Sequence, residues 1–246
     1  MKVLEVEKLN KNFDNIEVLK EIDLHIKKGE FISIVGPSGC GKSTLFRIIT
    51  GLERKYSGRA AIEGREAREY SKPIAYMPQK DLLLPWRTLY ENAKLPLEVA
   101  GIGKKEHQDM VLPLIEEFGL KGFEGSYPGE LSGGMRQRGA LLRTFLIGSD
   151  LMLLDEPFGA LDAITRMEMQ EWLLEIWRKH NHSILFITHD IDEALFLSDR
   201  VYVMTGRPGK ISLEIEVDEA RPRRREVLFG EKYTEHKRDI LKVLKK

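Results

Sequence analysis

The sequence has a single cysteine and no long hydrophobic run, and both absences narrow what this chain can be. One thiol, Cys40, cannot form an internal disulfide, so the fold fits a reducing compartment. The apolar runs 151–154 and 184–187 have the length of buried strands and are far too short to span a bilayer. The N-terminus alternates apolar and charged residues and lacks a signal-peptide core. These features predict a cytoplasmic protein whose membrane association, if any, depends on a partner.

Neither sign of charge is in excess. Lysine plus arginine number 39 and aspartate plus glutamate number 39, which gives a formal net charge of zero. This balance removes the general electrostatic argument for nucleic-acid binding, so we expect no nucleic-acid partner. The chain has 246 residues, of which 42% are hydrophobic, so it is long enough to bury a sizeable core.

The hydrophobic pattern alternates strands with helices. Helices are predicted at 42–50, over much of 88–118 with breaks at proline and glycine, after Ser132, and on a long amphipathic segment around Met169 and Trp177. Strands alternating with helices indicate a parallel sheet covered on both faces, with a helical lobe inserted at about 80–147. The predicted strands are 21–27, Phe31–Val35, 76–77, 151–154, Ser183–Thr188 and 201–204.

A complete P-loop follows the predicted strand Phe31–Val35 and opens a predicted helix. In this motif backbone amides surround the phosphates, the lysine (Lys42) neutralises the β- and γ-oxygens, and the first hydroxyl residue (Ser43) ligates magnesium. The motif therefore predicts a site for a nucleoside triphosphate and Mg²⁺. The residues of the motif are Gly36, Pro37, Ser38, Gly39, Cys40, Gly41, Lys42, Ser43 and Thr44.

A second glycine-rich turn, Ser132-Gly133-Gly134, opens another predicted helix. Backbone N–H groups at a helix N-terminus bind anions, and glycines let the backbone approach a phosphate closely. The chain thus has a second phosphate-binding surface. One chain seldom wraps two such surfaces around one nucleotide, whereas two chains facing each other can.

Two carboxylates end the apolar strand 151–154. Successive side chains of a strand point in opposite directions, so Asp155 and Glu156 are expected to have different functions. Asp155 can hold magnesium, and Glu156 can orient and deprotonate the attacking water. Acidic pairs also cap helices, but alongside a P-loop the catalytic interpretation dominates. His189 closes the strand Ser183–Thr188 at the same predicted edge, where parallel sheets bind ligands, although a lone histidine is more often structural.

These segments occur in the order found in ATP-binding subunits of ABC transporters, and residues 3–217 resemble that family. The resemblance implies an α/β P-loop NTPase fold of ABC type in a single domain, 1–246. It implies a mostly parallel core sheet at about 1–79 and 148–217, an N-terminal antiparallel β subdomain, an inserted helical subdomain at about 80–147, and a C-terminal tail at about 218–246. The motifs are the P-loop, Gln79, Leu131-Ser132-Gly133-Gly134, residues 153–157, Gly159-Ala160-Leu161-Asp162 and Thr188-His189-Asp190.

The resemblance also implies roles for individual residues. In that family two cassettes enclose two ATP molecules, each between the P-loop of one copy and the Ser-Gly-Gly turn of the other. Glu156 corresponds to the general base, His189 to the γ-phosphate contact, and Gln79 to the residue that contacts magnesium and the water. Phe13 corresponds to the aromatic that stacks on adenine, although an aromatic in a β segment is more often core, and Asp162 faces the partner copy.

One position departs from the family pattern. Met135 stands where the signature usually has glutamine. The hydroxyl of Ser132 and the backbone amides are unaffected by this change, so we expect phosphate binding to survive. Any contact made by the glutamine amide is left open.

Two further segments, 81–86 and 206–211, resemble importers of nitrate, sulfonate, taurine and thiamine precursors. The resemblance implies an ATPase subunit that works with integral membrane permease subunits, and indirectly with a substrate-binding protein, on the cytoplasmic face of the membrane. Leu83, Leu84 and Trp86 fit either lobe core or a docking surface. The basic run 221–225 is interpreted as a solvated loop, with lipid contact as the alternative.

A soluble ABC ATPase that assists iron–sulfur cluster assembly is the alternative function, because such proteins share every nucleotide motif. The Leu-Leu-Pro-Trp segment argues against it. DNA-repair ABC ATPases carry long coiled-coil or other insertions between P-loop and acidic strand, and this chain has no sustained heptads there. The transported solute is not encoded in an ATP site.

Overall fold

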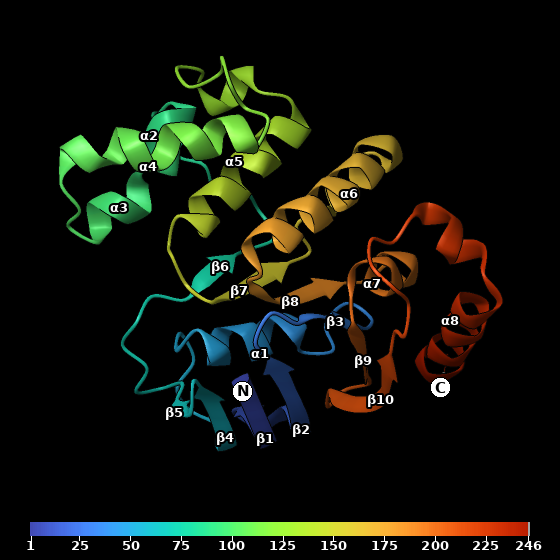
Figure 1. Ribbon diagram of the computed structural model, residues 1–246. Coiled ribbons are helices and arrows are strands. Elements are labelled where there is room, and N and C mark those ends of the chain that lie inside the picture. Colours follow the sequence, from blue (N-terminus) through green and yellow to red (C-terminus); the bar gives the residue numbers. More distant parts are fainter. Residues whose placement is uncertain (246) are drawn as a thin grey trace. The chain divides into compact units, whose positions relative to one another are not determined.

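The computed structural model describes residues 1–245, which divide into two compact units (Figure 1). The first unit consists of Met1–Lys72 together with the chain from Leu174 onward. The second unit is Pro73–Leu173. Of the helices within the described residues, none combines the length and the apolarity that crossing a bilayer requires.

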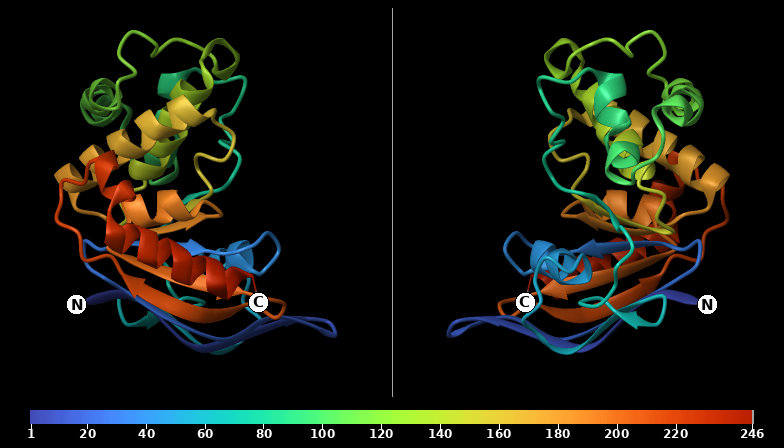
Figure 2. Two further views of the ribbon diagram at one scale, coloured as in Figure 1. Left: turned by 90° about the vertical axis from the view of Figure 1, so that its right-hand side faces the viewer. Right: turned by 90° about the vertical axis from the view of Figure 1, so that its left-hand side faces the viewer.

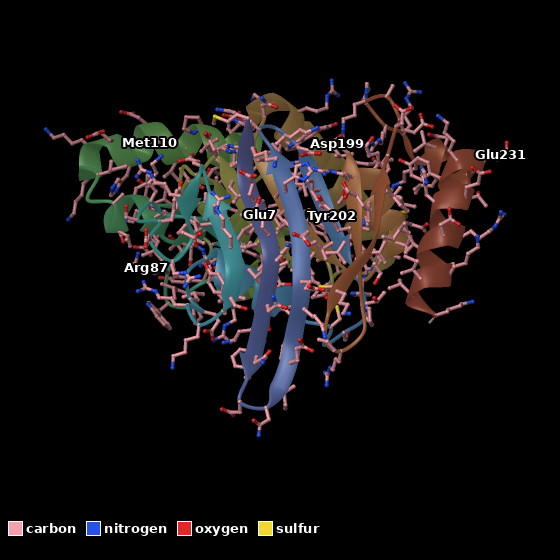
Figure 3. All side chains as sticks on the ribbon, turned by 90° about the horizontal axis from the view of Figure 1, so that it is seen from below. Glu7, Arg87, Met110, Asp199, Tyr202 and Glu231 are labelled. Carbon is pink, nitrogen blue, oxygen red and sulfur yellow. The ribbon has the colours of Figure 1, made fainter. Side chains whose placement is uncertain are left out.

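An antiparallel sheet forms one layer of the first unit. It contains β1 (Lys2–Phe13), β2 (Ile16–Lys27), β4 (Ser57–Ile62) and β5 (Arg65–Glu66) in the order β2-β1-β4-β5. Figure 3 shows β1, β2 and β4 side by side, with Glu7 on β1. Apolar side chains alternate with polar ones along β1 and β2, so one face of the sheet is buried and the other is solvated. The expected N-terminal antiparallel subdomain is confirmed.

The central strand of the first unit is β3 (Phe31–Val35), whose five residues are all buried. It pairs in parallel with β8 (Ser183–Thr188) on one side and with β9 (Arg200–Thr205) on the other. The antiparallel strand β10 (Lys210–Glu216) lies beside β9. A short, continuous apolar run is typical of a strand covered on both faces, and the prediction of a central strand here is confirmed.

Three helices of the first unit pack against its strands. The helix α1 (Lys42–Ile49) follows the P-loop and ends before Gly51, whose φ of +73° suits the turn that stops the helix. The helices α7 (Ile191–Leu197) and α8 (Glu231–Leu244) pack against β3 and β9 respectively, as Figures 1 and 2 show. Their shared core includes Val35, Leu195, Val203, Tyr233 and Ile240. Residues 231–244, part of the expected tail, therefore form a packed amphipathic helix.

The basic run 221–225 is largely structural. Arg223 is 6% exposed and donates hydrogen bonds to backbone oxygens at the end of α7, among them Leu195 and Phe196. Arg221 pairs with Asp199 at 2.8 Å. The last carbonyls of a helix lack partners within the helix and carry partial negative charge, so an arginine beside them satisfies both needs. The interpretation of this run as a solvated loop was wrong for Arg223.

The second unit combines a parallel strand pair with a group of helices. Strand β6 (Ala75–Met77) pairs with β7 (Leu151–Asp155). The predicted breaks at Pro96, Gly101 and Gly103 are found, because Pro96 lies in the first turn of α3, Gly101 has φ +72°, and Gly103 caps α4. Pro113, where the sequence predicts a further helix start or kink, lies inside α4, which continues to Glu117. The helical elements are α2 (Leu89–Ala93), α3 (Leu95–Val99), α4 (Lys104–Glu117), η1 (Pro128–Glu130), α5 (Gly133–Phe145) and the start of α6 (Ala163–His180).

Candidate functional site

In the first unit, two of the predicted site segments leave neighbouring parallel strands at the same level. The P-loop follows β3 and His189 follows β8, and Val35 lies opposite Thr188 in the register of the two strands. Gly36 and His189 therefore begin side by side at the carboxyl ends of the strands, which is the edge where open α/β sheets bind ligands. His189 is exposed at this edge.

The P-loop is a backbone cradle rather than a cluster of side chains. Gly39 and Gly41 have φ values of +77° and +105°, a region that side chains disfavour. Gly41 caps α1 without any side-chain bond, and no acidic residue lies in the first turn of the helix. The hydroxyl residue that follows the lysine, Ser43, is exposed. The N–H groups and dipole of α1 are thus arranged for an anion.

Lys42 is the charged group of this cradle. Its side chain is buried, and its Nζ donates to the backbone oxygens of Gly36 at 2.8 Å and Pro37 at 3.0 Å. Both acceptors are neutral, and no carboxylate within residues 1–245 forms an ion pair with this ammonium group. A buried positive charge without a counter-charge makes an anionic ligand favourable here.

Cys40 is buried inside the loop. Desolvation by burial raises the pKa of its thiol, and the nearby Lys42 and Arg207 charges only partly oppose this. The thiol therefore stays protonated at neutral pH and fills space as a small apolar group. Its backbone N–H, rather than its sulfur, is what the site can offer a phosphate.

Phe13 is not a core residue. It ends β1 and is 40% exposed, with Lys11 Nζ 4.2 Å from its ring centroid. An exposed ring of this kind can stack on a flat ligand such as a nucleobase. The alternative interpretation, that Phe13 is a buried core residue, is therefore wrong.

In the second unit, the carboxyl ends of β6 and β7 carry the remaining catalytic candidates, Gln79, Asp155 and Glu156. Met77 lies opposite Leu154 in the β6–β7 register, so Gln79 and Asp155 leave neighbouring strands together. The side-chain amide of Gln79 donates to Glu156 Oε2 at 3.4 Å. Glu156 has φ +45°, a conformation uncommon for a residue with a side chain. Such strain clusters at functional sites, and here it aims a carboxylate next to an amide partner.

The predicted magnesium ligands belong to both units, Ser43 to the first and Gln79 and Asp155 to the second, and each has suitable chemistry by itself. Ser43 offers an exposed hydroxyl, Gln79 an amide oxygen, and Asp155 a buried carboxylate. Magnesium prefers oxygen donors and is held by one or two carboxylates plus substrate phosphates rather than by a full protein cage. Within residues 1–245 no group of three or more histidines, cysteines, aspartates or glutamates is arranged to hold a metal ion.

The Ser-Gly-Gly turn lies at the start of α5, with Ser132 and Gly133 exposed and Gly134 half-buried. Ser132 Oγ accepts a hydrogen bond from Met135 N–H at 3.2 Å, so the hydroxyl caps its own helix. Methionine at position 135 leaves this backbone bond intact. A Cβ built on Gly134 would lie 3.1 Å from Thr165, so the turn lies beside the start of α6.

Asp162 belongs to the same surface as this turn. Its Oδ1 accepts hydrogen bonds from the backbone N–H of Ile164 and Thr165, at 3.1 and 3.0 Å. Hydrogen bonding from Thr165 holds the pKa of the Asp162 carboxyl below its usual value. The carboxylate is therefore ionised and fixed on an exposed face next to Ser132-Gly133-Gly134.

Gln137 is a site-supporting residue that the sequence motifs missed. Its side chain is buried and donates to the backbone oxygen of Pro157, directly after Glu156. It therefore ties α5 to the loop that carries the acidic pair. The only sequence signal was a glutamine among the buried residues of a helix, two positions after Met135.

The segment 81–86 divides between core and surface. Leu83 is 7% exposed, whereas Leu82 and Trp86 are 56% and 70% exposed. Asn92 is fully buried, and its amide bonds the backbone of Leu84 through both its oxygen and its nitrogen, as well as the carbonyls of 87 and 88. This clamp, which sequence reasoning missed, holds an apolar surface in a fixed shape.

The sequence is similar to those of ATP-binding proteins of ABC transporters. A sequence profile described as ABC transporter matches residues 19–159. An uncharacterized ABC transporter ATP-binding protein of Methanocaldococcus jannaschii is 42% identical, covering 100% of this chain and 92% of the relative. An aliphatic sulfonates import ATP-binding protein of Bacillus cereus is 44% identical over 84% of this chain and 81% of its own length. A nitrate import ATP-binding protein of Synechocystis is 41% identical, with coverages of 90% and 86%.

A solved structure of an ATP-binding cassette has a similar fold. The dimeric post-hydrolysis state of an ATP-binding cassette bound to ADP and Pi superposes with a TM-score of 0.75 at 27% sequence identity. The match covers 88% of this chain and 100% of the cassette.

Proposed function

Since the chain belongs to the ABC transporter family, as one of its ATP-hydrolysing cassettes, we propose that it drives solute import through partner membrane subunits. The observation that carries the nucleotide-binding part of this proposal is the buried ammonium of Lys42, which lies among neutral carbonyls in a loop of positive-φ glycines. This arrangement favours the phosphates of a nucleotide. The relatives whose names include import support the direction of transport.

The P-loop residues bind the phosphates of ATP, and the ring of Phe13 stacks on adenine. Lys42 exchanges its carbonyl partners for phosphate oxygens, which relieves a buried unbalanced charge. His189, which leaves β8 beside the P-loop, contacts the γ-phosphate. The backbone amides at the start of α1 supply the remaining donors.

Ser43, Gln79 and Asp155 are the residues that would hold Mg²⁺. The ion, when bound, neutralises charge that develops on the phosphate oxygens. Glu156 accepts the proton of the attacking water, and the amide of Gln79, 3.4 Å from Glu156 Oε2, keeps that carboxylate oriented.

A second copy of the chain completes the nucleotide site. The exposure of Ser132, Gly133 and Asp162 on one surface supports this step, because these groups are accessible to a second chain. The dimeric cassette structure supports it as well. Closing of two copies around two ATP molecules, followed by hydrolysis and reopening, would provide the work of transport.

The membrane partners dock on the surface formed by Leu82, Pro85 and Trp86. These apolar side chains are exposed on a loop that Asn92 clamps, which suits a preformed binding surface. The cassette then lies peripherally on the cytoplasmic face of the membrane. A substrate-binding protein takes part only through the membrane subunits. No feature favours the alternative of iron–sulfur cluster assembly.

Two substitutions test the catalytic assignment. Glu156→Gln should still bind ATP but hydrolyse it at least about a hundredfold more slowly, since general bases contribute roughly that much. Lys42→Ala should weaken ATP binding itself. Calorimetric titration and phosphate release measure the two effects, with Lys232→Ala on the exposed face of α8 as the control. Unchanged hydrolysis by the glutamine variant, or unchanged affinity of the alanine variant, would contradict the corresponding assignment.

A further inference from the structure

The P-loop packs against the turn between β9 and β10, residues 206–209. This turn is fixed to β2, because Gly209 N–H donates to Val18 O at 2.8 Å and Lys20 N–H donates to Gly209 O at 3.0 Å. The turn therefore cannot separate from β2 without losing these backbone hydrogen bonds.

The contact between turn and P-loop is between backbones. A Cβ on Gly209 would overlap the carbonyl oxygen of Cys40, and a Cβ on Gly36 would overlap the carbonyl oxygen of Met204. Glycine is needed at both positions because the two chain segments approach so closely. The turn thus supports the phosphate cradle from outside the motif itself.

The side chain of Arg207, in this turn, reaches into the loop. Its Nε donates to the carbonyl oxygen of Gly39 at 3.0 Å, and its guanidinium lies where a side chain on Gly39 would be. Arg207 is exposed, and no acidic group within residues 1–245 pairs with it. Its described hydrogen bond is therefore the one to the P-loop.

The hydrogen bond from Arg207 acts on a peptide group of the proposed phosphate-binding loop. The carbonyl of Gly39 and the N–H of Cys40 belong to one planar peptide, so holding the oxygen also fixes the direction of the N–H. A charged donor on the oxygen polarises the peptide and strengthens its N–H as a donor. Within the loop that N–H has only a weak partner, Pro37 O at 3.4 Å.

We propose that Arg207 is a positioning residue for nucleotide binding, acting through the Gly39–Cys40 peptide of the P-loop. The proposal rests on the nucleotide-binding function proposed above. It makes the β9–β10 turn part of the nucleotide site although no phosphate-binding motif includes it.

Three variants test this role. Arg207→Met keeps the length of the side chain and removes the donor, and should weaken ADP binding and raise the KM for ATP about tenfold, the loss typical of one charged hydrogen bond. The kcat at saturating ATP should stay within about twofold, because the affected interaction is made before and during the reaction alike. Arg207→Lys, which keeps a cationic donor, should recover affinity to within about threefold. Lys210→Met removes the same charge from an exposed position on the same hairpin and should change nothing.

Calorimetric titration with ADP and steady-state ATPase assays give these values, and thermal unfolding without nucleotide checks the fold. Should the methionine variant not fold, Arg207→Ala carries the same expectation. Affinity of the Arg207 variants equal to wild type would overturn the proposal, as would an equal loss in Lys210→Met, which would indicate bulk electrostatics. A wild-type protein that binds no ADP or ATP would instead overturn the proposed function.

Discussion

Two glycine-rich turns open helices in this chain, and the structure builds them in opposite ways. In the P-loop, Gly39 and Gly41 have positive φ, and the loop is packed by β2 and the β9–β10 turn. In the Ser132-Gly133-Gly134 turn neither glycine has positive φ, and Ser132 and Gly133 are exposed. Ser132 caps its helix with a side chain, whereas α1 has no side-chain cap.

The difference shows what glycine does in each place. In the P-loop, a side chain would be strained by the backbone conformation and would overlap neighbouring atoms. In the Ser-Gly-Gly turn, a Cβ on Gly133 would meet Leu161 at 3.5 Å, an ordinary contact. Folding therefore does not require glycine at 133. Because Gly133 has no side chain, its backbone is accessible to a ligand from outside the chain. This agrees with the proposal that the turn contacts the phosphate of a nucleotide bound by a second copy.

The largest effect expected from this comparison is at Gly41. Gly41→Ala should lower the free energy of unfolding by about 2–4 kcal/mol, because φ is +105° and the new Cβ would lie 2.5 Å from Leu19 Cδ2. Urea unfolding measures the change. Gly64→Ala is the matched control, since its φ is +79° and no atom lies within 4 Å of the new Cβ. Equal losses in the two variants would show that packing around the P-loop contributes nothing.

A smaller effect is expected at Ser132. Ser132→Ala removes the acceptor of the Met135 N–H and should lower the free energy of unfolding by about 1 kcal/mol. Ser132→Asp, which keeps a capping oxygen, should retain most of that stability. Urea titration of the three proteins decides the matter, and an alanine variant as stable as wild type would mean that the cap is not formed in solution.

The smallest effect on stability is expected at Gly133. Gly133→Ala should leave the free energy of unfolding within about 0.5 kcal/mol of wild type or raise it, because alanine favours the helix. The ATPase rate should nevertheless fall, since a methyl group now covers the backbone of the exposed turn. If this variant instead lost as much stability as Gly41→Ala, the contrast between the two turns would be refuted.

The sequence predicted the strands that carry the site with good accuracy. Phe31–Val35 and Ser183–Thr188 were predicted with the observed bounds, because uninterrupted apolar runs between turn residues leave few alternatives. The helix α8 was not predicted, because its apolar positions are sparse and only packing against β9 makes them a core. The burial of Arg223 was not predicted either. The charge of the run suggested a solvated loop, and the sequence does not reveal that carbonyl groups at the end of α7 need a hydrogen-bond donor.

The sequence by itself determined the chemistry: a complete P-loop, the Asp155–Glu156 pair after an apolar strand, and a serine–glycine turn at the start of a helix. These are local patterns, in which spacing along the chain fixes what each backbone and side-chain group can do. Tertiary structure decided the partners. The strand registers brought His189 beside Gly36 and Gln79 beside Asp155, and the packed β9–β10 turn brought Arg207 to Gly39. Contacts between residues far apart in sequence depend on strand pairing and burial, which local patterns do not encode.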